Sequence, residues 1–188
     1  MIFCRYIWKC EESFLQTKDL TAAALLAALA AVCSQLILPT PWGVPVSLGT
    51  LAVFLAAGLL GAKGASVSML IYLALGAVGV PVFAGFRGGL GVLAGPTGGY
   101  LIGYLALAGL GGMLCDCLPK TKYRLPLAFT CGLAACYALG TLWFAAVTGT
   151  PAASALALCV LPYLPADAVK IAVAAVLCRR IDRIRTED

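Results

Sequence analysis

The sequence predicts an all-α integral membrane protein with six transmembrane helices and both termini in the cytoplasm. Hydrophobic residues make up 62% of the 188-residue chain and charged residues only 11%, with a mean hydropathy of +1.00. Soluble domains carry about 25% charged residues, so this composition excludes an ordinary soluble domain. A helix that spans a bilayer needs about 20 apolar residues, and the chain has room for six such helices. We expect a single multi-pass domain over residues 1–188, located in the cell membrane.

The first membrane helix is expected at Leu20–Leu38, after a polar segment over residues 1–19 that we assign to the cytoplasm. A cleaved leader is the alternative, because Leu29–Cys33 approaches a lipoprotein cleavage box. Val32 precedes Cys33 where a small residue is wanted, and the apolar run is longer than the usual hydrophobic region of a signal peptide. We therefore expect this segment to remain in the protein as a membrane span.

Alanines recur at every fourth position of this span, at Ala23, Ala27 and Ala31. Small residues with this spacing make a smooth helix face that another helix can approach closely. An alanine-rich span also produces the spacing by chance, so the pattern alone does not establish a contact face.

Five further apolar segments are bounded by glycine, proline or charged residues and are expected to be membrane helices: Val46–Leu60, Ala65–Val80, Thr97–Leu114, Leu125–Val147 and Pro165–Arg183. The run Ala152–Leu161 is too short to span a bilayer and is followed by prolines, so we expect a re-entrant or interfacial piece there. Proline is favourable at the first position of a helix, which places the start of the last helix at Pro165.

Lysines and arginines are concentrated on one predicted side of the membrane. Of the 13 Lys and Arg residues, all except Arg87 and Lys170 fall in segments that are cytoplasmic if the N-terminus is inside, including the tail over residues 179–188. This distribution follows the positive-inside rule. The net charge of +5 therefore reflects membrane topology and does not indicate a nucleic-acid partner.

The nine cysteines give no indication of a metal centre. Most of them lie in apolar runs, where cysteine behaves as a small hydrophobic residue. Cys115 and Cys117 have the closest spacing, but the chain has no histidine, so we do not expect a zinc site. We predict no metal and no cofactor, and a reduced, cytoplasm-facing location for Cys115-Asp116-Cys117.

The stretch Gly79–Tyr100 differs from its apolar neighbours because eight of its 22 residues are glycine and two are proline. Glycine costs a helix interior about 1 kcal/mol relative to alanine, and proline about 3 kcal/mol, so a regular helix is disfavoured here. Irregular backbone in an apolar region is tolerated where protein buries it or where it lines an aqueous cavity. We expect this stretch to line a binding pocket, with an ordinary external loop as the alternative.

Three charges lie in apolar surroundings: Arg87 in the glycine-rich stretch, and Asp167 and Lys170 in the last helix. Charges inside a membrane are costly and are functional candidates by default. Asp167 and Lys170 are three residues apart, so they share a helix face and can pair. One carboxylate cannot neutralise both cations, and the remaining cation would suit an anionic group on a small, largely apolar ligand. The alternative is that the pair only fixes helix packing.

Three segments together resemble the BioY family, the biotin-binding S components of energy-coupling factor (ECF) transporters: Pro81-Val82-Phe83-Ala84, Gly95-Pro96-Thr97-Gly98-Gly99-Tyr100 and Pro165-Ala166-Asp167-Ala168-Val169-Lys170. The likeness covers essentially the whole chain. It implies a six-helix S-component fold that binds biotin near the extracellular side. It also implies docking, through the face of Ala23, Ala27 and Ala31, on a transmembrane T component coupled to two ABC ATPases. The chain has no P-loop, so we expect it not to be an enzyme and any ATP to be hydrolysed by another chain.

The biotin site implied by this resemblance combines charges, backbone and aromatic walls. Asp167 would accept hydrogen bonds from the ureido N–H groups, while Lys170 or Arg87 would meet the carboxylate or the carbonyl. The other members are Thr97 and Gly98 of the glycine-rich motif and the candidate aromatic walls Tyr100, Tyr72 and Phe83.

The chain departs from the family pattern at one place. Where the family usually shows Thr-Leu-Gln, this sequence has Ser47-Leu48-Gly49. The hydroxyl is retained and the amide is missing, so a ligand contact from that amide would be lost.

Three other functions compete with this interpretation. An intramembrane enzyme is disfavoured because the chain has no histidine and no base beside a serine or cysteine nucleophile. A channel or stand-alone carrier is disfavoured because no inverted repeat is evident. An S component for another vitamin would share the docking helix and differ only in the pocket.

Overall fold

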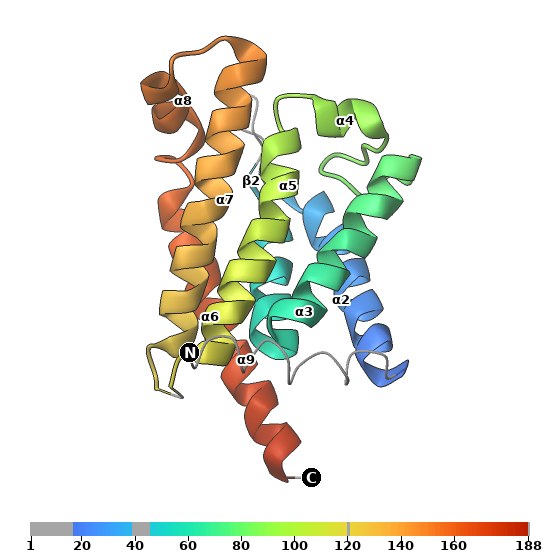
Figure 1. Cartoon of the computed structure of the whole chain (residues 1–188), viewed down its shortest axis with the longest axis vertical. Helices are drawn as coiled ribbons and strands as arrows, with labels where there is room; N and C mark the ends of the chain where they lie inside the picture. The colour runs from blue at the N-terminus through green and yellow to red at the C-terminus, as the bar shows by residue number, and fades with distance from the viewer. Residues whose placement is uncertain (1–16, 39–45, 120, 188) are drawn as a thin grey trace, which may run out of the picture.

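The computed structural model describes residues 17–38, 46–119 and 121–187 and shows a bundle of helices (Figure 1). Four helices are long and apolar enough to cross a membrane: Thr17–Gln35, Gly49–Val78, Gly98–Cys117 and Arg124–Thr148. The pair α8 (Ala152–Cys159) and α9 (Leu164–Glu187) passes the same test as one broken span with a bend of 54°, which gives up to five. The expected helical membrane fold is confirmed at this level.

The first helix of the described residues, α2 (Thr17–Gln35), begins and ends slightly before the expected span. It ends at Gln35 because the chain continues into a short antiparallel ribbon of β1 (Ile37–Leu38) and β2 (Val46–Ser47), in which Ile37 pairs with Ser47. The described residues exclude most of the polar segment over residues 1–19 that was assigned to the cytoplasm. They also exclude Pro39 and Pro41, which follow the expected span.

A glycine divides α3 (Gly49–Val78) into two limbs. Gly61 has φ 67° and ψ −170°, a conformation that is essentially restricted to glycine. In a straight helix Gly49 and Tyr72 would lie about 35 Å apart at 1.5 Å per residue. Both instead contact Ser34 of α2: the Tyr72 hydroxyl lies 2.9 Å from Ser34 Oγ, and a β-carbon at Gly49 would lie 2.8 Å from it. The two limbs therefore turn back toward the same part of α2, and the break at Gly61 lies between the segments Val46–Leu60 and Ala65–Val80 that were expected as separate spans.

Asp116 stabilises the break in α3 at Gly61. Its carboxylate accepts a hydrogen bond from the backbone N–H of Ala62 at 3.0 Å and lies directly over Gly61. The acid between Cys115 and Cys117 thus has a structural partner at the start of the second limb. In the described part of the chain no group of three or more His, Cys, Asp or Glu side chains could hold a metal.

The small-residue face of α2 points into the protein and not outward as expected. Ala23 and Ala27 are 0% and 2% exposed, because they pack in the interface between α2 and α3, and Ala31 is half-buried against the same core. Ala24 and Ala28, which are also four residues apart, are the exposed alanines of this helix. The expectation that Ala23 and Ala27 form a free docking face is wrong, since the helix uses them for its own packing.

The glycine-rich stretch is irregular, as expected, apart from the short helix α4 (Leu90–Ala94) and the start of the next helix at Gly98. Gln35 at the end of α2 fixes the glycine-rich stretch by two hydrogen bonds. Its side-chain amide donates to the carbonyl of Phe83 at 3.1 Å and accepts from the N–H of Phe86 at 2.8 Å. Phe83 is buried against Gly76, with its ring edge-on to Tyr72 at 5.6 Å. The stretch is therefore a packed cap on α2 and α3.

One long helix consists of α5 (Gly98–Ala106), the π-helical turn η1 (Leu107–Gly111) and α6 (Gly112–Cys117). It packs on α7 (Arg124–Thr148) through glycines that leave room for a partner side chain, with Gly99 against Trp143 and Gly140 against Tyr100. Close approach at small residues is the usual packing mode of membrane helices. Both helices match their expected spans to within a few residues.

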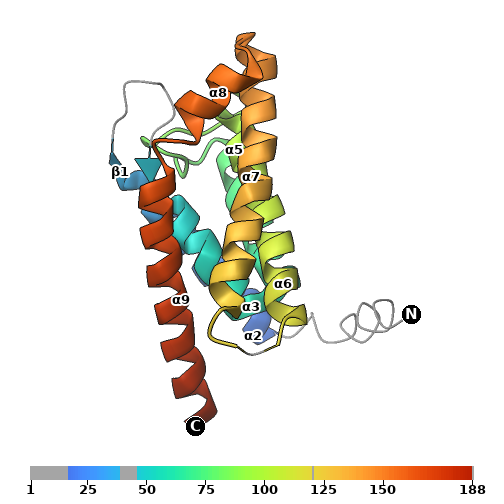
Figure 2. The same cartoon turned by 90° about the vertical axis from the view of Figure 1, so that its left-hand side faces the viewer.

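The final segment bends between α8 and α9, at the end of the bundle that also carries α4 (Figure 2). The apolar piece expected to be re-entrant or interfacial is the helix α8, and α9 begins at Leu164, beside the expected Pro165. This bend places the first turn of α9 next to β2, α5 and α7.

Gly61→Ala is expected to destabilise the protein, because alanine disfavours this backbone conformation by about 1–3 kcal/mol and its β-carbon would also meet the Asp116 carboxylate. Gly91→Ala is the matched control, since Gly91 lies in α4 and a β-carbon there meets nothing within 4 Å. Thermal unfolding of both variants in detergent measures the difference. Equal melting temperatures would contradict the role assigned to Gly61.

Candidate ligand-binding site

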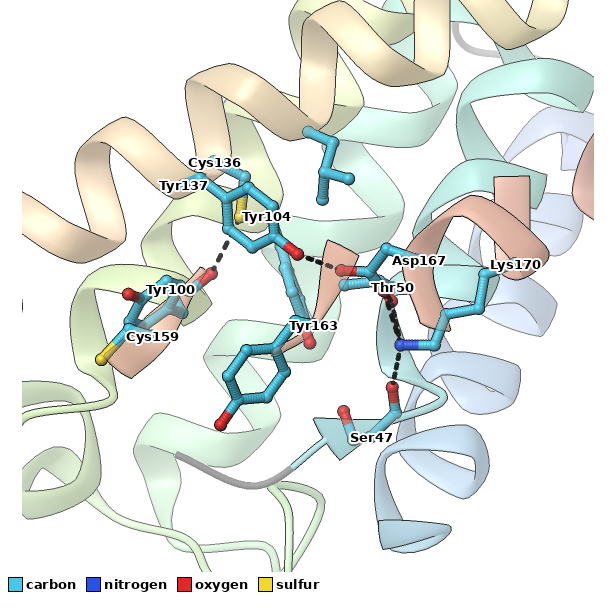
Figure 3. Close-up of a pocket in the computed structure, with 11 residues that line it drawn as sticks. Ser47, Thr50, Tyr100, Tyr104, Cys136, Tyr137, Cys159, Tyr163, Asp167 and Lys170 are labelled. Carbon is cyan, nitrogen blue, oxygen red and sulfur yellow. Dashed lines mark hydrogen bonds and ion pairs between the residues drawn. The ribbon is translucent and has the colours of Figure 1, made fainter. Parts of the chain in front are cut away.

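A cavity lies where the first turn of α9 faces β2, α3, α5 and α7 (Figure 3). It contains about 450 Å³ of space not filled by atoms, including the space at its mouth. Its walls are formed by Ser47, Thr50, Tyr100, Tyr104, Leu133, Cys136, Tyr137, Cys159, Tyr163, Asp167 and Lys170.

The two charges of α9 form a buried ion pair at this cavity. Lys170 Nζ lies 2.7 Å from Asp167 Oδ1, and the side chains are only 8% and 5% exposed. Asp167 is in the first turn of α9, where the helix dipole favours an anion. A buried charge without a partner costs several kcal/mol, so the pairing expected from the spacing of these residues is what permits both to be buried.

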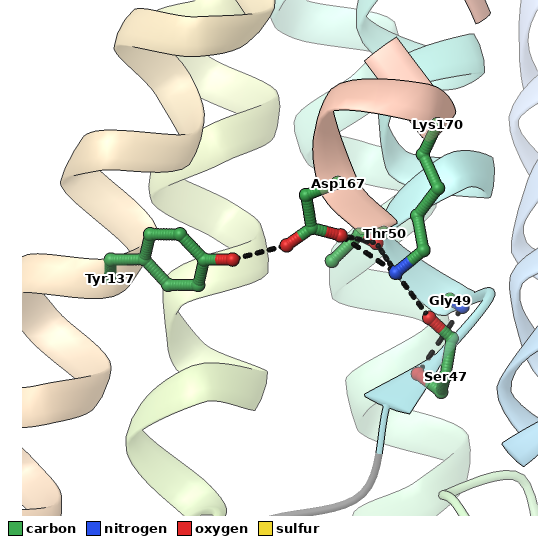
Figure 4. Close-up of polar contacts among 6 residues, drawn as sticks. All are labelled: Ser47, Gly49, Thr50, Tyr137, Asp167 and Lys170. Atoms are coloured by element: carbon green, nitrogen blue, oxygen red, sulfur yellow. Dashed lines mark hydrogen bonds and ion pairs between the residues drawn. The ribbon is translucent and has the colours of Figure 1, made fainter. Parts of the chain in front are cut away.

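Every N–H of the Lys170 ammonium has an acceptor within the protein. Besides Asp167, it donates to the carbonyl oxygen of Ser47 at 2.8 Å and to Thr50 Oγ1 at 3.1 Å (Figure 4). An ammonium group has three donors, and all three are used here. A ligand oxygen that contacts Lys170 must therefore replace one of these acceptors.

Asp167 is bound on both of its carboxylate oxygens. Oδ1 receives Lys170 and, at 3.4 Å, the hydroxyl of Thr50. Oδ2 receives the hydroxyl of Tyr137, which reaches across from α7 (Figure 4). The pair is thus electrically neutral and hydrogen-bonded by three separate elements: α7, α3 and the segment at β2.

Four of the seven tyrosines of the chain line this cavity: Tyr100, Tyr104, Tyr137 and Tyr163. Tyrosine supplies an apolar ring together with a hydroxyl that needs a partner when buried. The hydroxyl of Tyr100 lies 3.2 Å from Thr141 Oγ1 and that of Tyr137 binds Asp167. The cavity therefore offers flat apolar walls and a polar end at α9, which suits a small ring compound with hydrogen-bonding groups.

Some of the expected site residues line the cavity and others do not. Asp167, Lys170 and Tyr100 line the cavity. Tyr72 and Phe83 are each 1% exposed and belong to the packed core between α2 and α3. These two rings therefore pack in the core and do not form walls of the cavity.

Thr97 and Gly98 are also absent from the cavity wall. The carbonyl of Thr97 accepts the N–H groups of Tyr100 and Leu101 at 3.1 and 3.3 Å, and Gly98 packs closely against the carbonyl of Leu93. The two residues build the turn that starts α5 and so position Tyr100.

Arg87 does not join the two charges of α9. Its side chain is exposed on the glycine-rich stretch, and it is not among the residues that line the cavity. An exposed guanidinium keeps its hydration and avoids the cost of burying an unpaired charge. The expected meeting of all three charges in one cavity is therefore wrong for Arg87.

Sequence reasoning missed most of the cavity wall. Tyr104 could have been found, because it follows Tyr100 by four residues and shares its helix face. Tyr137 and Tyr163 come from other segments, and nothing in their local sequence relates them to Asp167. Cys136 and Cys159 are buried free cysteines, in keeping with their treatment as small hydrophobic residues.

The departure at Ser47-Leu48-Gly49 has a structural counterpart. A β-carbon at Gly49 would lie 2.8 Å from Ser34 Oγ, 3.0 Å from the Tyr104 hydroxyl and 3.2 Å from Ser47 Oγ. Three hydroxyl groups thus border the space that a side chain at this position would need. A glutamine there would have to displace them.

Comparison with known proteins gives one consistent result. The family model described as "BioY family" matches residues 9–187. A protein of Rhodobacter capsulatus named "Biotin transporter BioY" is 36% identical over 181 residues, which is 87% of this chain and 90% of that protein. A protein of Pyrococcus horikoshii named "Probable biotin transporter BioY" is 38% identical over 170 residues, covering 89% of this chain and 98% of its own length.

The fold also matches a solved structure. The crystal structure of the S-component for biotin from an ECF-type ABC transporter superposes with a TM-score of 0.84 at 26% sequence identity, covering 93% of this chain and 95% of that chain. The match of the family model over nearly all of the sequence, the similarity to both relatives and the shared fold agree, and this chain belongs to the BioY family.

Proposed function

We propose that this protein binds biotin and acts as the substrate-specific S component of an ECF-type transporter that takes up biotin across the cell membrane. The observation that carries the proposal is the tyrosine-lined cavity with the buried pair of Asp167 and Lys170, in a chain of the BioY family. The relatives are named as biotin transporters, and the related structure is that of an S component for biotin.

Biotin matches the chemistry of this cavity. Its fused ring system is apolar apart from a cyclic urea, and the four tyrosine rings offer apolar walls of that kind. The urea N–H groups are donors, and Asp167 is the carboxylate at the polar end of the cavity. The described lining residues hold no uncommitted cation for the biotin carboxylate, so Lys170 contacts a ligand oxygen only by releasing Ser47 or Thr50.

The membrane arrangement that we propose has six spans and cytoplasmic termini. The two limbs of α3 count as separate spans, and α8 with α9 forms the last one. In support, basic residues gather at one end of the bundle. Arg179 donates a hydrogen bond to the carbonyl of Lys122 there. Lys63 follows the break in α3, where Asp116 of α6 accepts from the N–H of Ala62. The starting end of α2 and the C-terminal end of α9 lie at this end too, away from α4 and α8 (Figure 1).

The transport partners that we propose are a transmembrane T component and two ABC ATPases, since this chain carries no P-loop of its own. The face of α2 that remains open to such a partner is the one with Ala24 and Ala28, because Ala23 and Ala27 are buried.

Binding of radiolabelled biotin to the purified protein tests the function. Lys170→Ala is expected to weaken binding by more than about tenfold, because a charge-assisted hydrogen bond contributes about 1.5–3 kcal/mol. Arg87→Ala is the matched control and is expected to change the dissociation constant by less than about twofold, as for an ordinary surface substitution. The double variant Asp167→Asn with Lys170→Met removes both charges together and checks binding in a protein with no unpaired buried charge.

Two outcomes would contradict this assignment. Tight binding of riboflavin or thiamine by wild-type protein, without biotin binding, would make it an S component for another vitamin. Equal losses for Lys170→Ala and Arg87→Ala would place the ligand outside the cavity described here.

Ala28→Trp is expected to prevent co-purification with the T component while leaving biotin binding intact, because a large ring keeps two helices from close approach. Leu139→Trp is the control, since Leu139 is 45% exposed on α7, away from α2. Pull-down of the co-expressed T component measures both variants. Unchanged recovery with Ala28→Trp would show that the partner uses another face.

A further inference from the structure

The two oxygens of the Asp167 carboxylate are not equally occupied. Oδ1 accepts from Lys170 and from Thr50, whereas Oδ2 accepts from Tyr137 alone among the described residues. A carboxylate has about four acceptor sites, two on each oxygen. The unused acceptor site is therefore on Oδ2, the oxygen nearer α7.

Tyr137 is the group that holds this oxygen in place. The terminal torsion of an aspartate is broad, so bonds on both oxygens are needed to fix the plane of the carboxylate. Lys170 and Thr50 fix Oδ1 from α9 and α3, and Tyr137 fixes Oδ2 from α7. Without the Tyr137 hydroxyl, Oδ2 would have no hydrogen-bond donor among the described residues and would be free to turn toward the ammonium of Lys170.

The hydroxyl of Tyr137 has a different task from that of Tyr100. Tyr100 bonds to Thr141 on α7 and contributes to the cavity wall. Tyr137 instead bonds to Asp167, and it extends the chain of contacts Ser47–Lys170–Asp167 across the cavity (Figure 4).

We propose that Tyr137 is a positioning residue for ligand recognition: its hydroxyl orients the Asp167 carboxylate so that the free acceptor site of Oδ2 receives one urea N–H of the ligand. This rests on the proposed function, because it takes the ligand to be biotin. The selectivity for a donor at this point of the ligand then depends on α7 as well as on the charged residues of α9.

The test compares Tyr137→Phe with wild-type protein for three ligands. These are biotin and its two lactam analogues, in each of which one urea N–H is replaced by CH₂. The hydroxyl deletion is expected to weaken biotin binding about tenfold, and to weaken the lactam that retains the Asp167-facing N–H by a similar factor. The other lactam is expected to bind weakly to wild-type protein and to change less than about twofold on substitution, since the deleted bond then has nothing to orient.

Tyr123→Phe is the control, because Tyr123 is an exposed tyrosine just before the start of α7 and does not line the cavity. Thermal unfolding of each variant checks that the fold is retained. The proposal is overturned if Tyr137→Phe binds biotin like wild-type protein, or if all three ligands weaken by the same factor, which would indicate a purely structural role. If wild-type protein does not bind biotin at all, the result would instead contradict the proposed function.

Discussion

The salt bridge between Asp167 and Lys170 requires polar partners among the apolar helices of the bundle. A buried ion pair is tolerated only where its remaining donors and acceptors are also satisfied. Three separate elements supply these partners, through the carbonyl of Ser47, the hydroxyl of Thr50 and the hydroxyl of Tyr137. The end of the bundle that carries the cavity is therefore arranged around this pair, and the bend between α8 and α9 brings the pair into position.

The rest of the structure is apolar and is held together by helices that approach one another closely. Glycines and alanines stand at several helix contacts, as at Gly99 with Trp143, Gly140 with Tyr100 and Ala27 with α3. Within a bilayer, lipid is as apolar as leucine, so tight van der Waals packing at small residues replaces the hydrophobic driving force. The need for close packing also explains why Ala23 and Ala27, which were expected to form a docking face, are buried. Their neighbours Ala24 and Ala28 are exposed.

The glycine-rich stretch has a structural role that differs from the one expected. It does not bring Arg87 to the charges of α9, and its buried aromatic, Phe83, fills the space over Gly76. It contributes its last residue, Tyr100, to the cavity wall, and the turn at Thr97 and Gly98 begins α5 and so presents Tyr100 and Tyr104 to the cavity. At Gly49, three hydroxyl groups border the space that a larger side chain would need.

Composition, the positions of apolar runs and the spacing of Asp167 and Lys170 were enough to predict a helical membrane protein, most helix bounds and the ion pair. These properties are local, because a helix is read from consecutive residues and residues three apart share its face whatever surrounds them. The partners of the pair, the inward direction of Ala23 and Ala27, and the exclusion of Arg87 followed only from the tertiary structure. They depend on how helices distant in sequence rotate and bend against one another, and the single bond from Tyr137 on α7 to Asp167 on α9 has no signature in either segment alone.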